Sequence, residues 1–169
     1  VETARAVSIA NIITFDMGGT STDVALIENG RPGMTTEAEV HGYPIKCPMI
    51  DIQTVGAGGG SIAHVDSGDL LKVGPRSAGA DPGPICYGLG NEEPTVTDAN
   101  VVMGALNPEA LLGGRMPIDR DAAAVAMEKL GMRLGLSIEE TAAGVIRVVT
   151  ANMVRTIRVI SVQRGHDPR

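Results

Sequence analysis

Residues Ile13–Ile27, "ITFDMGGTSTDVALI", carry the strongest structural signal in the sequence, because two apolar segments flank a short polar turn. Branched apolar residues on both sides predict two strands joined as a hairpin. Between the strands stand two glycines and three hydroxyl residues, enclosed by Asp16 and Asp23. This composition favours anion binding, because glycine lets an anion approach the backbone N–H groups and hydroxyls add further donors.

The turn suits a phosphate accompanied by a divalent cation. The candidate phosphate ligands are its small residues, Gly18, Gly19, Thr20, Ser21 and Thr22. Asp16 and Asp23 are the candidate metal ligands, because carboxylates repel a bare phosphate but hold a hydrated Mg²⁺ or Mn²⁺ that neutralises it. A tight hairpin without any ligand is the alternative that composition alone leaves open.

A second glycine-rich loop, "VGAGGGS", covers residues 55–61 and also follows an apolar run. It lacks the lysine of a Walker A loop, and Ser61 stands where a dinucleotide-binding fingerprint requires its last glycine. A bulged connector between strands is the alternative interpretation. Two such loops in one chain nevertheless favour a phosphate-binding cleft over two unrelated turns.

Composition excludes several classes of protein. The 169 residues carry a net charge of -6 with a pI near 5.0, which argues against binding to nucleic acid. No run approaches the roughly 20 apolar residues of a membrane span, and no signal peptide is recognisable. Cys47 and Cys86 lack companions at metal-ligand spacing. We therefore expect a cytoplasmic protein with no membrane and no nucleic-acid partner.

The first 90 residues predict strands and shaped loops. "NIITF" and "TDVALIE" read as the hairpin strands, Asn29-Gly30 as a tight turn, and "GMTTEAEV" as a third strand of a meander. Glycine and proline are frequent over residues 43–90, which disfavours helices there. Short strands are expected instead at "MIDIQTV", "SIAHV" and "LLKVG".

Residues 91–169 predict three helices. The first, in "TVTDANVVMGAL", has Thr97 as its candidate N-cap, and the second begins after Asp119 and ends at Gly131. The third opens with a capping box of Ser137 and Glu140 and carries one apolar stripe to about residue 165. The change from strands to helices near residue 91 is the single predicted boundary, between parts 1–90 and 91–169.

Four segments resemble a known family. "DMGGTSTDVALI", "DIQTVGAGGGSIAHVDSG", "VGPRSAGADPGPICYG" and "PTVTDANVVMGAL" are similar to core segments of the hydantoinase A / 5-oxoprolinase family, which includes the β subunit of acetone carboxylase. The resemblance runs from about residue 11 to residue 169. It implies an α/β fold, a lobe of the actin-like (ribonuclease-H-like) ATPases with a β-meander and glycine-rich loops followed by helices. Longer family members imply that residues 1–169 form a partial domain.

The resemblance implies that the intact parent is an ATP-dependent hydrolase. It would use ATP with Mg²⁺ or Mn²⁺ to phosphorylate a carbonyl or enol oxygen and open a cyclic amide such as hydantoin, N-methylhydantoin or 5-oxoproline. A hydantoinase B-type partner subunit or domain and an oligomeric parent are implied as well, with the isolated fragment inactive. The alternatives are an ATP-binding subunit of an acetone-type carboxylase and a non-catalytic nucleotide-binding or subunit-interaction module.

The resemblance also implies roles for individual residues. It places Asp16 at the metal and in catalysis, the turn residues around the phosphates, and three glycines where a phosphate approaches the backbone, namely Gly58, Gly59 and Gly60. Asp51 would stand beside the cleft as a metal-shell or base residue, unless its carboxylate only holds the following loop. Asp98 reads as a charge at a helix N-terminus, and none of His41, His64 and His166 is a catalytic candidate.

Overall fold

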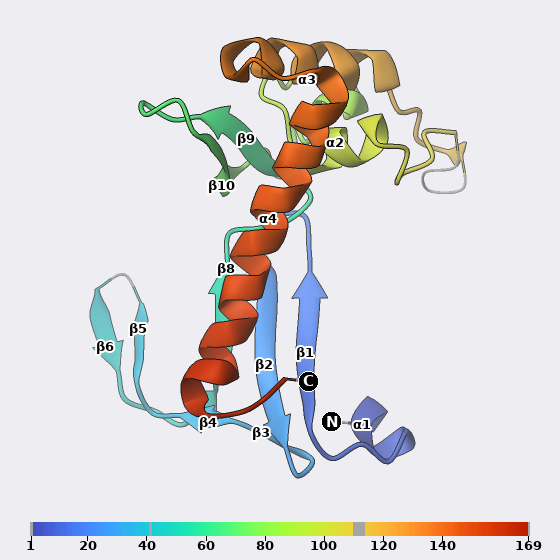
Figure 1. Ribbon diagram of the computed structural model, residues 1–169. Helices are drawn as coiled ribbons and strands as arrows, with labels where there is room; N and C mark the ends of the chain where they lie inside the picture. The colour runs from blue at the N-terminus through green and yellow to red at the C-terminus, as the bar shows by residue number, and fades with distance from the viewer. Residues whose placement is uncertain (1, 41, 110–113, 169) are drawn as a thin grey trace. The chain divides into compact units, whose positions relative to one another are not determined.

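The computed structural model describes residues 2–40, 42–109 and 114–168 (Figure 1), without the side chains of residues 4 and 38–40. The chain forms two compact units. Unit 1 comprises Val1–Asp16, Asp23–Thr54 and Val154–Arg169, and unit 2 comprises Met17–Thr22 and Val55–Met153. The strands precede residue 91 and the longer helices follow it, as predicted, but the units do not divide there. The turn of the first hairpin belongs to unit 2 although both of its strands lie mostly in unit 1.

Unit 1 is built on the predicted hairpin. Its sheet consists of β1 (Ile12–Met17), β2 (Thr22–Glu28), β3 (Arg31–Pro32) and β8 (Ile52–Val55). β2 is central, pairing with β1, with β3 and with β8. The Asn29-Gly30 turn between β2 and β3 is confirmed, since φ is positive at both residues (50° and 72°). Val24 and Ile27 of β2 are buried, and Ile160 at the end of α4 is a further buried apolar residue of this unit.

The predicted third strand is wrong in its length. "GMTTEAEV" is divided into β4 (Met34–Thr35) and β5 (Ala38–Val40), which pair with β7 (Met49–Ile50) and β6 (Tyr43–Ile45) respectively. The break has a local cause, because the hydroxyl oxygen of Thr35 accepts a hydrogen bond from the Glu37 backbone N–H at 3.1 Å. A short helix that the sequence did not predict, α1 (Glu2–Ala6), precedes the sheet.

Unit 2 contains the larger core. Its elements are β9 (Ser61–Val65), β10 (Leu71–Ser77), the 3₁₀ turn η1 (Ile85–Tyr87), α2 (Val96–Val102), α3 (Arg120–Leu134) and most of α4 (Ile138–Ile160). β9 and β10 form an antiparallel hairpin. The core is aliphatic, as the near absence of aromatic residues requires, and Val96, Met127 and Val145 are at most 1% exposed. None of the helices in the described part of the chain has the length and apolar character of a membrane span.

The predicted helix starts are mostly confirmed. Asp119 caps α3 by accepting a hydrogen bond from the Ala122 N–H at 2.8 Å. Ser137 and Glu140 form the predicted capping box of α4, at 2.9 and 3.2 Å. Thr97 was the wrong N-cap for α2, because Thr95 occupies that position.

The predicted helix ends are corrected by one turn. α3 continues past Gly131 to Leu134, and Gly135 ends it in the left-handed conformation with φ 67°. Gly131 is needed for packing instead, since a Cβ there would lie 2.7 Å from the backbone oxygen of Leu136. α4 ends at Ile160, and the 3₁₀ turn η3 (Val162–Arg164) follows it.

Candidate functional site

The candidate site is the turn of the first hairpin, residues 18–21, within unit 2. The Gly18 N–H donates to the backbone oxygen of Ser21 at 2.9 Å, which closes a tight turn. Gly19 and Thr20 are exposed and Ser21 is half-buried. Within the described part of the chain, no acceptor pairs with the backbone N–H groups of these three residues. They are donors that a ligand can use.

The second glycine-rich loop is hydrogen-bonded to one side of the turn. The Gly59 N–H donates to the Gly18 carbonyl at 3.1 Å, and the Gly60 N–H donates to the Gly19 carbonyl at 2.6 Å. Gly58 permits this approach, because a Cβ there would lie 2.7 Å from both the Gly18 oxygen and the Thr20 nitrogen. The glycines at 58–60 therefore let two loops of the protein meet.

These two hydrogen bonds determine the direction of the backbone N–H groups in the turn. In a planar trans peptide, the C=O of one residue and the N–H of the next point in opposite directions. Because the carbonyls of Gly18 and Gly19 face the glycine-rich loop, the N–H groups of Gly19 and Thr20 face away from it. Both residues are exposed and neither N–H has an acceptor in the described chain, so the turn keeps two adjacent unpaired donors. Adjacent N–H groups in such a turn form an anion-binding concavity.

Two further segments fix the glycine-rich loop. The backbone N–H and the hydroxyl of Thr97, at the start of α2, both donate to the Gly59 carbonyl, at 2.8 and 2.9 Å. The Ala78 N–H donates to the Gly60 carbonyl at 2.8 Å. The Ser77 hydroxyl also lies 3.4 Å from the Thr20 hydroxyl. The turn is thus supported by rigid elements and is positioned before any ligand arrives.

Thr22 is engaged within the protein. Its side chain is fully buried, and its hydroxyl donates to the Ala57 carbonyl at 2.5 Å. The structure brings all eight predicted phosphate ligands together, and they fall into two groups. Gly19, Thr20 and Ser21 have hydrogen-bond donors without an acceptor in the described chain. In the other five residues the donors bond within the protein: Gly18, Thr22, Gly58, Gly59 and Gly60.

Replacing Thr22 tests its structural role. Thr22→Val keeps the shape but removes the donor to Ala57, so we expect a loss of about 1–2 kcal/mol in the free energy of unfolding. Ser21→Ala is the matched control, because no acceptor for its hydroxyl exists in the described chain, and its cost should stay below about 0.5 kcal/mol. Urea denaturation measures both. Equal losses would contradict the assignment.

The three candidate carboxylates all belong to unit 1. Asp16 is exposed near the end of β1. Asp23 accepts a hydrogen bond from the Thr54 hydroxyl at 2.5 Å. Asp51 forms an ion pair with Arg164, and its backbone N–H donates to the Gly33 carbonyl at 2.9 Å. The Asp51 carboxylate thus pairs with Arg164 of η3, a distant partner that the sequence did not reveal, and not with the following loop. Its predicted role as a metal-shell or base residue stays a prediction.

A metal centre made only of protein ligands is not present in the described chain, because no group of three His, Cys, Asp or Glu side chains converges there. Mg²⁺ does not require one. It keeps several waters and binds through one or two carboxylates together with the phosphate oxygens of its nucleotide. Single carboxylates such as those of Asp16 and Asp23 fit that donor set.

Asp98 was predicted only as a charge at the start of a helix. In the structure it is also a buried hydrogen-bond acceptor. Its carboxylate accepts hydrogen bonds from the N–H groups of Ile85, Cys86 and Thr95 and from the Thr95 hydroxyl, at 2.7–3.2 Å. Burial, reinforced by the charge of Asp98, raises the pKa of the Cys86 thiol. The spacing T-x-x-D of a capping box could have identified this residue as the anchor of α2.

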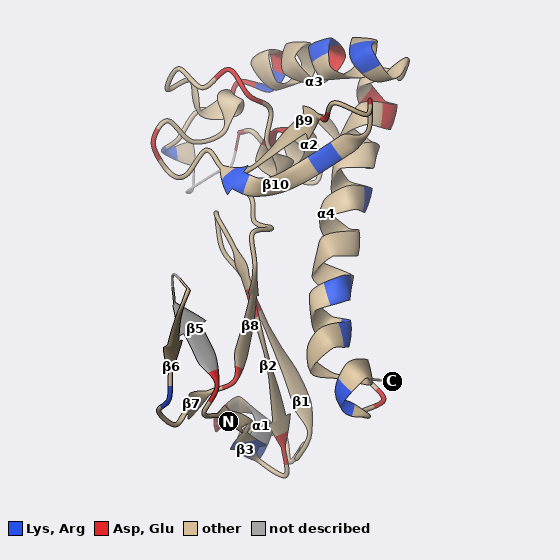
Figure 2. Cartoon of the chain, turned by 90° about the vertical axis from the view of Figure 1, so that its left-hand side faces the viewer, with Lys and Arg blue, Asp and Glu red and all other residues tan. Residues whose placement is uncertain are grey.

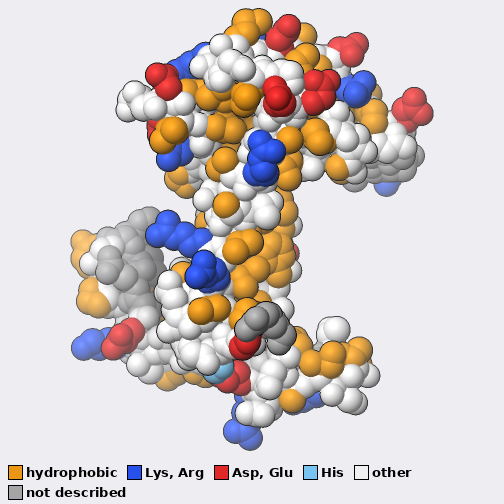
Figure 3. All heavy atoms as spheres, in the orientation of Figure 1, with side chains coloured by type: hydrophobic (Ala, Val, Ile, Leu, Met, Phe, Trp, Pro, Cys, Tyr) orange, Lys and Arg blue, Asp and Glu red, His pale blue; other side chains and the backbone are white. Residues whose placement is uncertain are grey.

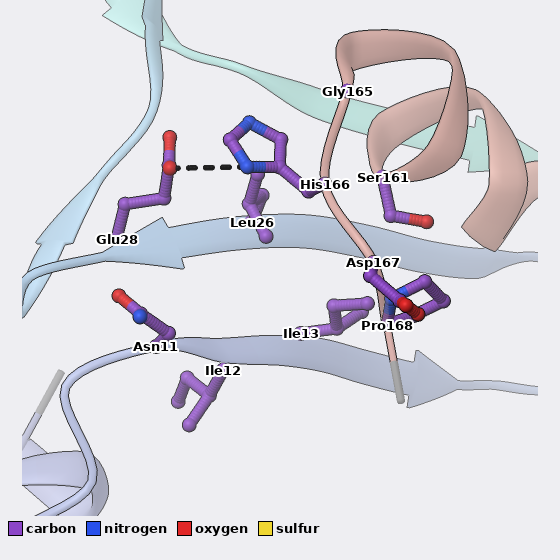
Figure 4. Close-up of a pocket in the computed structure, with 10 residues that line it drawn as sticks. All are labelled: Asn11, Ile12, Ile13, Leu26, Glu28, Ser161, Gly165, His166, Asp167 and Pro168. Atoms are coloured by element: carbon purple, nitrogen blue, oxygen red, sulfur yellow. Dashed lines mark ion pairs between the residues drawn. The ribbon is translucent and has the colours of Figure 1, made fainter.

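The histidines do not enter the turn. His166 Nδ1 lies 3.3 Å from Glu28 Oε1, at the wall of a pocket of about 440 Å³ in unit 1. Figure 4 shows this pair above the sheet, with Ile12 and Ile13 of β1 among the other lining side chains. His64 lies on β9, and His41 is outside the described residues.

Known proteins are similar to this chain in sequence and in fold. The family described as hydantoinase/oxoprolinase matches residues 1–169. The α subunit of caprolactamase from Pseudomonas jessenii is 51% identical over 98% of this chain, which covers 24% of that subunit. 5-oxoprolinase 1 from Arabidopsis thaliana is 38% identical over 94% of this chain, covering 14% of that protein.

Two solved structures agree with the fold. A nucleotide-free structure of acetone carboxylase, from a study of ATP-dependent acetone carboxylation, matches 99% of this chain and 24% of its own, with a TM-score of 0.91 at 33% identity. ATP-dependent caprolactamase from Pseudomonas jessenii matches 98% of this chain and 24% of its own, with a TM-score of 0.89 at 51% identity. They confirm the predicted α/β fold of the ATPase-like class.

The family model covers every residue of the chain, and the two structures superpose on almost all of it. The chain spans about a quarter of the length of the caprolactamase subunit. The turn and its supporting loops therefore lie in the part that these relatives share with it. On this evidence the chain belongs to the hydantoinase/oxoprolinase family.

Proposed function

We propose that this chain holds the phosphates of ATP in an enzyme that opens cyclic amides. The observation that carries the proposal is the turn at residues 18–21, whose carbonyls are held by the glycine-rich loop and whose Gly19 and Thr20 N–H groups face outward. A phosphate accepts hydrogen bonds from such a pair, and the hydroxyls of Thr20 and Ser21 add two further donors. The names of the ATP-dependent caprolactamase and of the 5-oxoprolinase support the reaction.

The chemistry explains why an amide hydrolase needs a phosphate site. An amide resists hydrolysis because its carbonyl carbon is a weak electrophile, and ATP with Mg²⁺ would supply the phosphoryl group that turns the amide oxygen into a leaving group. The residues of this chain would bind the phosphates of ATP and orient them. Gly19 and Thr20 hold a phosphate through fixed N–H groups, which costs no reorganisation during reaction. Asp16, two residues before Gly18, is the proposed ligand of the hydrated cation, with Asp23 in its outer shell.

The comparisons support a cyclic amide as the substrate class. Identity is 51% to the caprolactamase subunit, against 44% to the γ subunit of acetophenone carboxylase from Aromatoleum aromaticum and 33% to the acetone carboxylase chain. An acetone-type carboxylase remains the second candidate, supported by its TM-score of 0.91. Dependence of ATP turnover on bicarbonate separates the two, since a carboxylase consumes it and an amide hydrolase does not. A non-catalytic module would turn over no ATP with either substrate.

The proposed metal role has a direct test. In the full-length protein that contains this chain, Asp16→Asn is expected to weaken Mg-ATP binding at least about tenfold, because a hydrated divalent cation loses its charged ligand. Isothermal titration with and without Mg²⁺ measures the effect, and the variant should lose most of the enhancement that Mg²⁺ provides. Asp121→Asn, an exposed carboxylate on α3, is the control. Equal Mg-ATP affinities in the wild type and Asp16→Asn would overturn the assignment.

We further propose that the parent works with a hydantoinase B-type partner subunit. The relative from Pseudomonas jessenii is named as a subunit, which supports a multi-subunit enzyme. Unit 1 also exposes large hydrophobic side chains that a partner or the rest of the parent could cover: Met34, Tyr43, Ile50 and Ile52.

We also propose a cytoplasmic location. A reaction that consumes ATP requires a compartment supplied with ATP, which supports this location.

A further inference from the structure

A second pocket lies in unit 2, apart from the turn. Its volume is about 620 Å³, within the range of small-molecule sites. It is lined by β9, by α3 and by the loop at residues 91–94. Figure 2 shows α3 above β9, with acidic and basic residues along the helix, and Figure 3 shows charged and hydrophobic side chains interspersed on the visible face of this unit.

One wall of the pocket holds a nitrogen without a partner. His64 on β9 lines the pocket, and its Nδ1 atom is buried with no hydrogen bond in the described chain. A buried polar atom left unpaired costs about 1–3 kcal/mol, so this wall contains a polar group that the protein itself does not satisfy.

The helix wall is apolar along one stripe and basic along the next. Ala122 and Ala126 are one turn apart on α3 and contribute small apolar surfaces. Lys129 and Arg133 are also one turn apart and line the same pocket. Neither cation has an ion-pair partner in the described chain. Like charges one helical turn apart repel each other. An anionic group between them would relieve that repulsion.

The loop wall is acidic and fixed. Glu93 forms an ion pair with Arg76 at 2.6 Å, and this hydrogen-bonded guanidinium lowers the pKa of Glu93. Asn91 holds the loop through two hydrogen bonds with the Glu93 backbone, at 2.8 and 3.1 Å. Glu92, also in the lining, has no partner in the described chain. The pocket thus offers one unpaired carboxylate and two unpaired cations on different walls.

We propose that this pocket binds an amino acid whose carboxylate and ammonium groups are separated by a short apolar chain. The carboxylate pairs with Lys129 and Arg133, the ammonium group pairs with Glu92, and the chain lies on Ala122 and Ala126.

The identity of the ligand rests on the proposed function. Hydrolysis of a cyclic amide breaks its C–N bond, adds the hydroxyl of water to the carbon and a proton to the nitrogen, and so yields an amino acid of this kind. The pocket is therefore a product site separate from the phosphate turn. Product bound there is available to regulate the enzyme.

The test uses the full-length protein without ATP and 6-aminohexanoate as the probe. Isothermal titration should show binding of this zwitterion and at least about tenfold weaker binding of hexanoate and of hexylammonium, because each lacks one charged end. The double variant Lys129→Ala with Arg133→Ala should weaken binding of the probe at least about tenfold, and so should Glu92→Gln. Arg120→Ala, at the start of α3 and outside the lining, should leave binding unchanged.

Two results would overturn the proposal. One is the absence of binding by the wild type, and the other is equal affinity in the wild type and the double variant, which would place the probe elsewhere. Mg-ATP affinity is measured on the same proteins. Normal ATP binding without probe binding rejects the product site alone, whereas loss of ATP binding by the wild type rejects the proposed function.

Discussion

Gly58→Ala is expected to lower the free energy of unfolding by about 2–4 kcal/mol and to weaken ATP binding at least about tenfold. The added Cβ would lie 2.7 Å from the Gly18 oxygen and 2.7 Å from the Thr20 nitrogen. Both are backbone atoms and cannot rotate away, so the two loops must separate. Separation breaks the hydrogen bonds that aim the Gly19 and Thr20 N–H groups at the ligand.

Gly19, in the hairpin turn that Gly58 contacts, provides the matched control. Gly19→Ala adds the same methyl group where nothing lies within 4 Å, so its cost in stability should be below about 0.5 kcal/mol. Neither glycine has positive φ, so backbone strain does not separate the two variants. Chemical denaturation compares their stabilities, and titration with Mg-ATP measures the binding. If Gly58→Ala were as stable as Gly19→Ala, the contact between the loops would be contradicted.

Asp98→Ala is expected to destabilise the protein by about 3–5 kcal/mol. The carboxylate is fully buried and accepts four hydrogen bonds, which tie η1 to the start of α2. Without it, the N–H groups of Cys86 and Thr95 stay buried without this acceptor, and each such group carries its desolvation cost. Asp98→Asn should also be strongly destabilising, because its amide N–H₂ group would face donors.

Asp119→Ala calibrates this effect. Asp119 also caps a helix, but it is exposed and its side chain accepts a single hydrogen bond in the described chain, from the Ala122 N–H, so its loss should cost about 1 kcal/mol. Thiol labelling gives a second readout in a Cys47→Ser background, since Cys47 is exposed and Cys86 is buried. Asp98→Ala should speed the labelling of Cys86, whereas Asp119→Ala should change it little. Labelling that is equally slow in both variants would contradict the proposed anchor.

Local patterns allowed much of the fold to be predicted. The hairpin was predicted from one continuous segment of the chain. The Asn29-Gly30 turn, the Asp119 cap and the capping box at Ser137 were predicted from residues within four positions of one another. Such signals act through side chains and backbone groups of neighbouring residues, so they can be recognised without knowledge of the tertiary structure. The errors were also local. Thr95 and Thr97 are equally good cap residues by type, and only the bonds to Asp98 distinguish them.

The amino-acid pattern alone was enough to predict a glycine- and hydroxyl-rich turn after a strand and a second glycine-rich loop. Which of these residues keep unpaired donors depends on tertiary packing. Thr22 and Ala57 are 35 positions apart, and Asp51 and Arg164 are 113 apart. No local pattern encodes such pairs, because they form when distant segments pack together. The outward N–H groups at Gly19 and Thr20 exist for the same reason, since Gly59 and Gly60 hold the other side of the turn.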